Sequence, residues 1–139
     1  MLRKATLDDM SFVNECLPKM EANKFKSLLT GDYIFIIENE SNVKIGVLVY
    51  FELWEKLPFI EHIIITSKYR NKGYGTKALL EFEKLMKNEG YKMILLSTQI
   101  DQKAQFLYRK LGYTDCGGLT FENTPFDQPL EVFMKKYLS

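Results

Sequence analysis

The residues best suited to chemistry form a short basic loop, Arg70-Asn71-Lys72-Gly73-Tyr74-Gly75, which we call the glycine loop. Its two glycines lack a Cβ atom, so the backbone can adopt positive φ angles and point successive N–H groups at one anion. A helix expected to begin near Thr76 adds its own unpaired N–H groups and the positive end of its dipole. Arg70 and Lys72 add positive charge. The loop therefore predicts a binding site for a diphosphate.

The segments on both sides of the glycine loop fit that interpretation. Residues 59–65 are rich in β-branched and aromatic side chains, as in a buried strand, and they end at the polar pair Thr66-Ser67. Residues 76–88 repeat apolar side chains at helical spacing, and Gly90 is the expected stop. The sequence thus predicts a strand, a glycine-rich turn and a helix N-terminus in succession.

The spacing of the glycines excludes two common phosphate-binding motifs. The pattern GxxxxGK[ST] is absent. The dinucleotide pattern GxGxxG also fails, because Ala78 occupies the place of its third glycine. What remains is the pattern Arg70-x-x-Gly73-x-Gly75.

In this context the pattern resembles the acetyl-coenzyme A signature of the GNAT N-acetyltransferase superfamily. A later stretch resembles the family's second signature, which usually begins with asparagine: Asp101-x-x-Ala104-x-x-Leu107-Tyr108-x-x-Leu111-Gly112-Tyr113. The opening pattern Arg3-Lys4-Ala5-Thr6-x-x-Asp9 extends the resemblance to nearly the whole chain. The resemblance implies an acetyltransferase that uses acetyl-coenzyme A as the donor and no metal.

The resemblance also assigns the residues expected to bind the donor. They lie at the end of the strand, in the glycine loop and in the second signature: Ile64, Ile65, Arg70, Asn71, Lys72, Gly73, Tyr74, Gly75, Thr76, Asp101, Ala104 and Tyr108. Two positions depart from the family pattern. Asp101 replaces the usual asparagine, which keeps a helix cap but brings a negative charge near the coenzyme, and Ser67 replaces a frequent proline.

Acetyl transfer to an amine requires a neutral amine, a polarised thioester carbonyl and a proton for the leaving thiolate. By position in the family, the Ile65 amide is expected to bind the carbonyl oxygen. Tyr108 falls on a tyrosine that many members use as the general acid, and a hydroxyl pKa near 10 suits that task. The alternative is that Tyr108 packs in the core beside Phe106, Leu107 and Leu111.

Glu61 is the candidate general base, because some relatives carry a comparable glutamate on this strand. His62, the only histidine, could act instead near neutral pH. Adjacent strand residues face opposite sides, so at most one of the two is expected in a given pocket. Both could equally lie on a solvated strand end.

The fold expected for residues 1–139 is α/β, with one N-acetyltransferase (GNAT) domain built on a mixed, strongly twisted sheet of six or seven strands and helices on both faces. The expected strands cover residues 2–5, 33–38, 44–52, 59–65, 93–97, a short stretch after Tyr113, and 130–137. Helices are expected before Pro18 and over 19–29, 76–88 and 102–110. Asp101 is the expected cap of the last helix, and Gly46 marks a bulge.

Composition limits which classes of protein this chain can belong to. The 139 residues are 46% hydrophobic, as in a globular domain, and 19 basic against 18 acidic residues give a net charge of only +1. That balance argues against a nucleic-acid surface, and no apolar stretch is long enough to cross a membrane, so a cytoplasmic location is expected. Cys16 and Cys116 lie in no metal or redox spacing and are expected to stay unpaired.

The acceptor stays open between a small-molecule amine and a peptide. Four acidic side chains could attract a cationic amine if they converge: Glu52, Glu55, Glu61 and Asp101. Trp54, on a loop before the glycine-loop strand, could line the acceptor pocket or cover the core. A homodimer could form through the strand at 130–137.

Transfer is expected to be direct, within a ternary complex, because neither cysteine has a histidine partner. Two other functions remain: a non-catalytic acyl-coenzyme A binding or sensing module, and another nucleotide-binding α/β domain. Fold alone does not decide among them.

Overall fold

A single seven-stranded sheet organises the computed structural model, which describes all 139 residues. The strand order is β1-β2-β3-β4-β5-β7-β6, and every neighbouring pair is antiparallel except β4 and β5. The strands are β1 (Leu2–Lys4), β2 (Ile34–Glu38), β3 (Lys44–Leu53), β4 (Leu57–Ile65), β5 (Met93–Gln99), β6 (Thr114–Leu119) and β7 (Glu131–Tyr137). The prediction of a mixed sheet with six or seven strands is confirmed.

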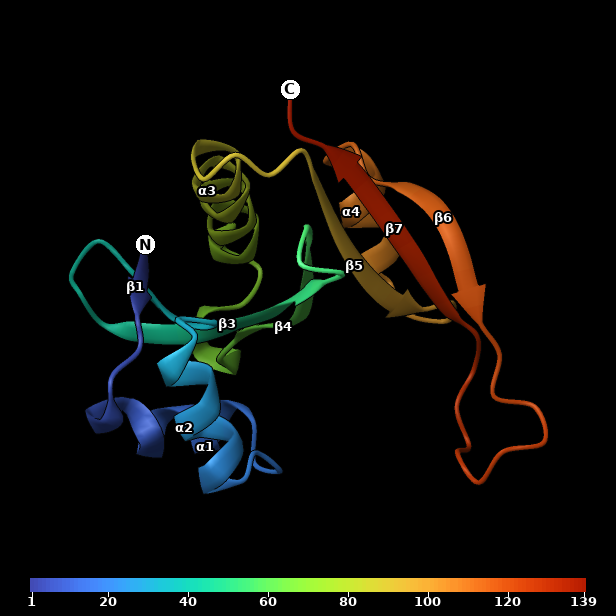
Figure 1. Ribbon diagram of the computed structural model, residues 1–139. Helices are drawn as coiled ribbons and strands as arrows, with labels where there is room; N and C mark the ends of the chain where they lie inside the picture. The colour runs from blue at the N-terminus through green and yellow to red at the C-terminus, as the bar shows by residue number, and fades with distance from the viewer.

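Helices cover both faces of the sheet, as predicted. The short helices α1 (Met10–Cys16) and α2 (Ala22–Thr30) lie on one side of β2 and β3, and α3 (Tyr74–Asn88) lies on the other (Figure 1). Helix α4 (Ala104–Lys110) follows β5, and two 3-10 turns complete the set, η1 (Leu7–Asp9) and η2 (Ser67–Tyr69). None of the helices has the length and apolar character needed to span a bilayer.

Two apolar clusters follow from the alternation of side chains along β2 and β3. Ile34 and Ile36 face α1 and α2, whereas Phe35 and Ile37 face α3. Because both faces of these strands are covered, their sequences are apolar almost without interruption. Figure 1 shows the β5–β7–β6 part of the sheet turned steeply away from the β2–β3–β4 part. That turn opens the sheet between β4 and β5.

A buried carboxylate, Asp9, ties the first strand to the rest of the sheet. Arg3 forms two hydrogen bonds of 3.0 Å to it, and Lys44 Nζ lies 2.6 Å from its Oδ1. The backbone N–H of Thr6 donates to its Oδ2 at 2.8 Å, which forms a capping box at the start of η1. Its positively charged partners and the Thr6 N–H hold the pKa of Asp9 well below its ordinary value, against the opposing effect of burial.

Gly46 is required for the close approach of β3 to the end of β4. A Cβ atom built on this residue would overlap the backbone carbonyl oxygen of Ile64. The expected bulge lies at the preceding residue, because Ile37 pairs with Gly46 and Glu38 with Lys44, which leaves Ile45 as the extra residue.

Several element boundaries differ from the predictions, and three of them bear on the turn before β4 and on the two later helices. Strand β4 begins at Leu57, because Trp54 and Glu55 both take positive φ angles and close a tight turn between Leu53 and Leu57. Helix α3 begins two residues early, at Tyr74, so Gly75 lies inside its first turn. Helix α4 begins at Ala104, two residues later than predicted.

The expectation that the strand at residues 130–137 offers an edge for pairing two copies is wrong. Strand β7 lies between β5 and β6 and is paired on both sides. The hairpin that joins β6 to β7 folds β6 outward, so the two edge strands of the sheet are β1 and β6.

Candidate functional site

The glycine loop has the backbone geometry of an anion site. Asn71 and Gly73 take φ angles of +61° and +85°, and Gly73 is the N-cap of α3. The N–H of Lys77 makes a helical bond to Gly73 at 3.1 Å, so the N–H groups of the three residues before it lie ahead of the helical ladder. A Cβ on Gly73 would meet no atom within 4 Å. The loop therefore leaves open space beside a converging set of donors, which suits a diphosphate.

Two side chains of this loop are engaged with the protein itself. Arg70 Nε donates to the carbonyl oxygen of Ile65 at 2.7 Å and so joins the loop to the end of β4. The Tyr74 hydroxyl donates to Glu40 at 3.2 Å, which turns the ring toward the β2–β3 connection. At these positions the backbone, rather than the side chain, is available to an anion.

Strands β4 and β5 separate along the part of β4 that leads to the glycine loop. They pair only at Phe59 with Leu95 and at Ile60 with Leu96. The Thr66 N–H donates to Ile45 on β3 at 2.8 Å, so by alternation the Ile65 N–H points to the other side, toward the gap beside β5. The backbone groups of Ile64 face β3 by the same alternation. The Ile65 amide is thus directed into an opening that no strand fills.

A bulge in β4 changes the predicted orientation of Glu61 and His62. Val49 pairs with His62 and Tyr50 with Ile60, which leaves Glu61 as an extra residue. A bulge breaks strict alternation, so both side chains enter the same cavity. The prediction that at most one of them faces a given pocket is wrong.

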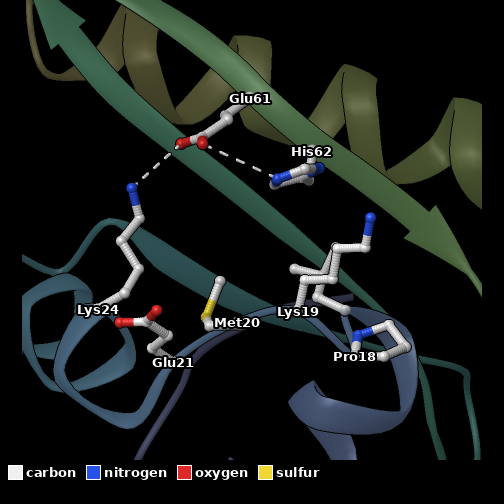
Figure 2. Close-up of a pocket in the computed structure, with 8 residues that line it drawn as sticks. Pro18, Lys19, Met20, Glu21, Lys24, Glu61 and His62 are labelled. Atoms are coloured by element: carbon white, nitrogen blue, oxygen red, sulfur yellow. Dashed lines mark ion pairs between the residues drawn. The ribbon is translucent and has the colours of Figure 1, made fainter. Parts of the chain in front are cut away.

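This cavity, which we call the helix–strand cavity, lies between β4 and the segment joining α1 to α2 (Figure 2). It has a volume of about 590 Å³. Its lining residues are Leu17, Pro18, Lys19, Met20, Glu21, Lys24, Glu61 and His62. Apolar and charged side chains line the same cavity, which suits a small polar molecule with an apolar part.

Glu61 is held between two nitrogen groups. Its Oε2 lies 3.7 Å from Lys24 Nζ, and its Oε1 lies 3.8 Å from His62 Nε2 (Figure 2). The Glu61 side chain is 35% exposed, so solvent or a ligand can reach the carboxylate.

Tyr108 lies on α4 and makes the core contacts that the packing alternative predicts, while its role as general acid stays a prediction. Its half-buried ring packs against the core cluster on the α3 side and stands edge-on to Tyr113, with ring centroids 6.1 Å apart. Burial raises the pKa of Tyr108 above its ordinary value, which keeps the hydroxyl protonated at neutral pH. Tyr113 in turn donates to Glu83 at 2.8 Å, and Lys136 binds the same carboxylate at 2.8 Å.

Comparison with known families decides the class of the protein. Residues 4–113 match the Acetyltransferase (GNAT) family. This chain belongs to the GNAT acetyltransferase family. That range contains the glycine loop, the bulged strand and Tyr108, so the three features described above lie inside the conserved family domain.

Solved structures share the GNAT fold over almost the full chain. The Ard1 protein of Thermoplasma volcanium superposes with a TM-score of 0.85 at 14% identity, over 100% of this chain and 97% of that one. A spermidine N-acetyltransferase of Vibrio cholerae, in complex with CoA and spermine, has a TM-score of 0.82 at 17% identity, over 99% and 95%. The ribosomal-protein-S18-alanine N-acetyltransferase of Escherichia coli gives 0.78 at 14%, over 100% and 94%. No curated protein matches the chain significantly. At these identities the likeness establishes the fold.

In this GNAT chain Asp101 does not cap α4. The N-cap is Lys103, and no side chain caps the helix. The turn is held instead by Gln105, whose Nε2 donates to Ile100 O at 2.6 Å and to Gln102 O at 3.1 Å. Gln105 is accordingly buried, because the turn carbonyls need a donor that only a folded contact reveals.

The other predicted acidic groups do not converge on the helix–strand cavity. Glu52 accepts a hydrogen bond from the Tyr33 hydroxyl at 3.2 Å, and Glu55 lines a separate cavity near Gly90. Trp54 is 72% exposed and lines neither the core nor the helix–strand cavity. Both cysteines are free. Of the four acidic candidates, Glu61 alone reaches this site.

Proposed function

We propose that this GNAT protein transfers an acetyl group from acetyl-coenzyme A to a primary amine of a small molecule or peptide, by direct transfer in a ternary complex. The observation that supports this most is the separation of β4 from β5 beside the glycine loop. The Ile65 amide and Glu61, which lines the helix–strand cavity, both belong to β4, and the glycine loop follows the end of this strand, which supports one site built from the three.

The donor is proposed to bind through the backbone of the glycine loop. The N–H groups at Gly73, Tyr74 and Gly75 suit its diphosphate, and Thr76 continues the first turn of α3. Lys72 supplies nearby positive charge, while Asn71 supplies the positive φ angle that bends the loop. When bound, the coenzyme supplies an activated thioester, the group that an amine can attack.

The chain's own residues supply the proton transfers and the polarisation. Glu61 accepts a proton from the acceptor ammonium, directly or through a water molecule, which produces the neutral amine. The Ile65 N–H stabilises the negative charge that develops on the thioester oxygen. The new C–N bond forms as the C–S bond breaks, and the Tyr108 hydroxyl donates a proton to the leaving thiolate. The second proton that the amine nitrogen loses passes through solvent and restores the Tyr108 hydroxyl.

The test combines donor binding with thiol release. Calorimetry with acetyl-coenzyme A is expected to show binding, and thiol release is expected with at least one pool among amino acids, polyamines, aminosugars, aminoglycosides and peptides. The similar structures include a spermidine N-acetyltransferase and a ribosomal-protein N-acetyltransferase, so both classes of acceptor belong in the pools. Binding without release from any pool would support a sensing module instead, and absence of binding would contradict the proposed function.

Replacing Gly73 by alanine is expected to weaken acetyl-coenzyme A binding. The positive φ of +85° strains an L-residue, so unfolding free energy should fall by about 1–2 kcal/mol. Gly90→Ala is the matched control, because Gly90 has a φ of +96° with equal free space but lies at the far end of α3. Urea unfolding should show similar losses for both variants, while calorimetry should show weaker binding only for Gly73→Ala. Equal binding by both would remove the glycine loop from the donor site.

A further inference from the structure

The helix–strand cavity carries both signs of charge in equal number. Lys19 and Lys24 stand against Glu21 and Glu61, with His62 as the remaining ionisable group. In Figure 2 the Lys24 ammonium points across the cavity to Glu61, while Glu21 stays beside the base of Lys24 and Lys19 lies on the opposite side, below His62. A cavity with this balance is complementary to a ligand that itself carries both charges.

The Lys24–Glu61 pair occupies the place where an acceptor ammonium must bind. The two charged atoms are 3.7 Å apart, and the side chains are 50% and 35% exposed, so the pair can open without burying a bare charge. An incoming ammonium that reaches Glu61 displaces the Lys24 ammonium. The displaced Lys24 ammonium then has no ion-pair partner unless the ligand supplies an anion.

We propose, resting on the acetyltransferase function above, that the acceptor is a primary amine with an anionic group close to it, as in an amino acid. Its ammonium replaces Lys24 at Glu61, and its carboxylate or phosphate pairs with the released Lys24 or with Lys19. The number of ion pairs is thereby conserved during binding. Leu17, Pro18 and Met20 then contact the apolar part of the acceptor.

A plain amine or a polyamine has no anionic group that could pair with the released Lys24. Its ammonium would share Glu61 with the Lys24 ammonium, and like charges at such distances repel. Each further ammonium of a polyamine would meet Lys19 or Lys24 with only Glu21 to offset them. The same charges that admit an anionic amine therefore disfavour a polycation.

The test uses acceptors that differ only in the anionic group. Thiol release from acetyl-coenzyme A is measured with L-amino acids, their carboxamides and the corresponding decarboxylated amines, and with O-phosphoethanolamine against ethanolamine. Spermidine is the polycation arm. We expect kcat/KM at least about tenfold higher for the carboxylate or the phosphate member of its series, and the series in which the preference appears identifies the anion.

Lysine variants assign the preference to the cavity. Lys24→Gln and Lys19→Gln should reduce the ratio of kcat/KM between an amino acid and its amide, mainly through KM. Lys26→Gln is the matched control, because Lys26 lies on the same helix but outside the cavity lining, and it should leave the ratio unchanged. A ratio between two acceptors is insensitive to the fraction of protein that is folded.

Each outcome separates this inference from the proposed function. Acetylation of amines regardless of the anionic group, or a preference for spermidine, would overturn the inference and leave the acetyltransferase function in place. A carboxylate preference that survives both Lys24→Gln and Lys19→Gln would also overturn it. If no amine in these arms is acetylated but a peptide, aminosugar or aminoglycoside is, the inference fails and the proposed function stands; if no pool at all is acetylated, both fail.

Discussion

Replacing Tyr108 by phenylalanine should lower kcat by about 10²–10⁴-fold, the usual contribution of a positioned general acid. The substitution removes only the hydroxyl, so the packing of the ring against the α3-side cluster and against Tyr113 is kept. Stability and acetyl-coenzyme A affinity should therefore change little. Steady-state kinetics, thermal unfolding and calorimetry on the same preparation measure the three quantities.

The pH profile offers an independent readout of the same role. Burial raises the pKa of Tyr108 above its ordinary value near 10, so the acid form persists throughout the neutral and mildly alkaline range. The loss of kcat on deprotonation is expected above pH 10, and this alkaline limb should disappear in the phenylalanine variant.

Tyr113→Phe is the control for Tyr108. It also removes one tyrosine hydroxyl from the same aromatic pair, but that hydroxyl donates to Glu83 within the protein. This variant should lose about 1–3 kcal/mol of stability, because Glu83 Oε2 loses its donor while Lys136 still binds Oε1, and it should keep its turnover. An unchanged kcat in Tyr108→Phe, or equal losses in both variants, would remove Tyr108 from the mechanism.

The fold was predictable because local patterns and tertiary packing agree over most of the chain. The uninterrupted apolar runs in β2 and β3 indicate strands covered on both faces, and the structure buries them between helices. The glycine loop was predictable for a similar reason. Gly73 takes the positive φ angle that its residue type favours and caps α3, whereas the second positive φ angle lies at Asn71, because Gly75 belongs to the first turn of the helix.

The arrangement of the candidate site depends on pairing between distant segments, which a single sequence does not encode visibly. The bulge at Glu61 follows from the register between β3 and β4, and it overrides the alternation from which opposite orientations of Glu61 and His62 were expected. The same limit applies to Lys24, which reaches Glu61 from another element, and to Gln105, which is buried by a turn. Motifs locate such a site, but strand register and helix packing decide which side chains enter it.

Replacing Asp9 by asparagine should lower the unfolding free energy by about 3 kcal/mol at pH 7, the lower part of the range for breaking a buried ion pair. The side chain of Asp9 is 2% exposed, and its two partners would lose their shared anion. Arg3 would keep its contact to Glu38 at 3.1 Å, which limits the loss. Urea unfolding of both proteins at pH 7 measures the difference.

The effect of this substitution should depend on pH in a defined direction. Because the folded-state pKa of Asp9 is lowered, its contribution to stability is present above the unfolded value near 3.9 and is lost as pH falls toward the folded value. The difference between the wild type and Asp9→Asn should therefore be largest near neutral pH and shrink below about pH 4.

Asp32→Asn provides the matched comparison, since Asp32 forms an ion pair of 3.3 Å with Lys4 but is 59% exposed. An exposed pair contributes about 0.5 kcal/mol or less, so this variant should unfold almost as the wild type does. Equal losses of unfolding free energy for Asp32→Asn and Asp9→Asn would contradict the stabilising role given to the buried Asp9 carboxylate. If the asymmetry holds, β1 is joined to β3 by a buried charge cluster, and because none of Arg3, Asp9 and Lys44 lines the helix–strand cavity, Asp9→Asn should change stability without changing which acceptor is preferred.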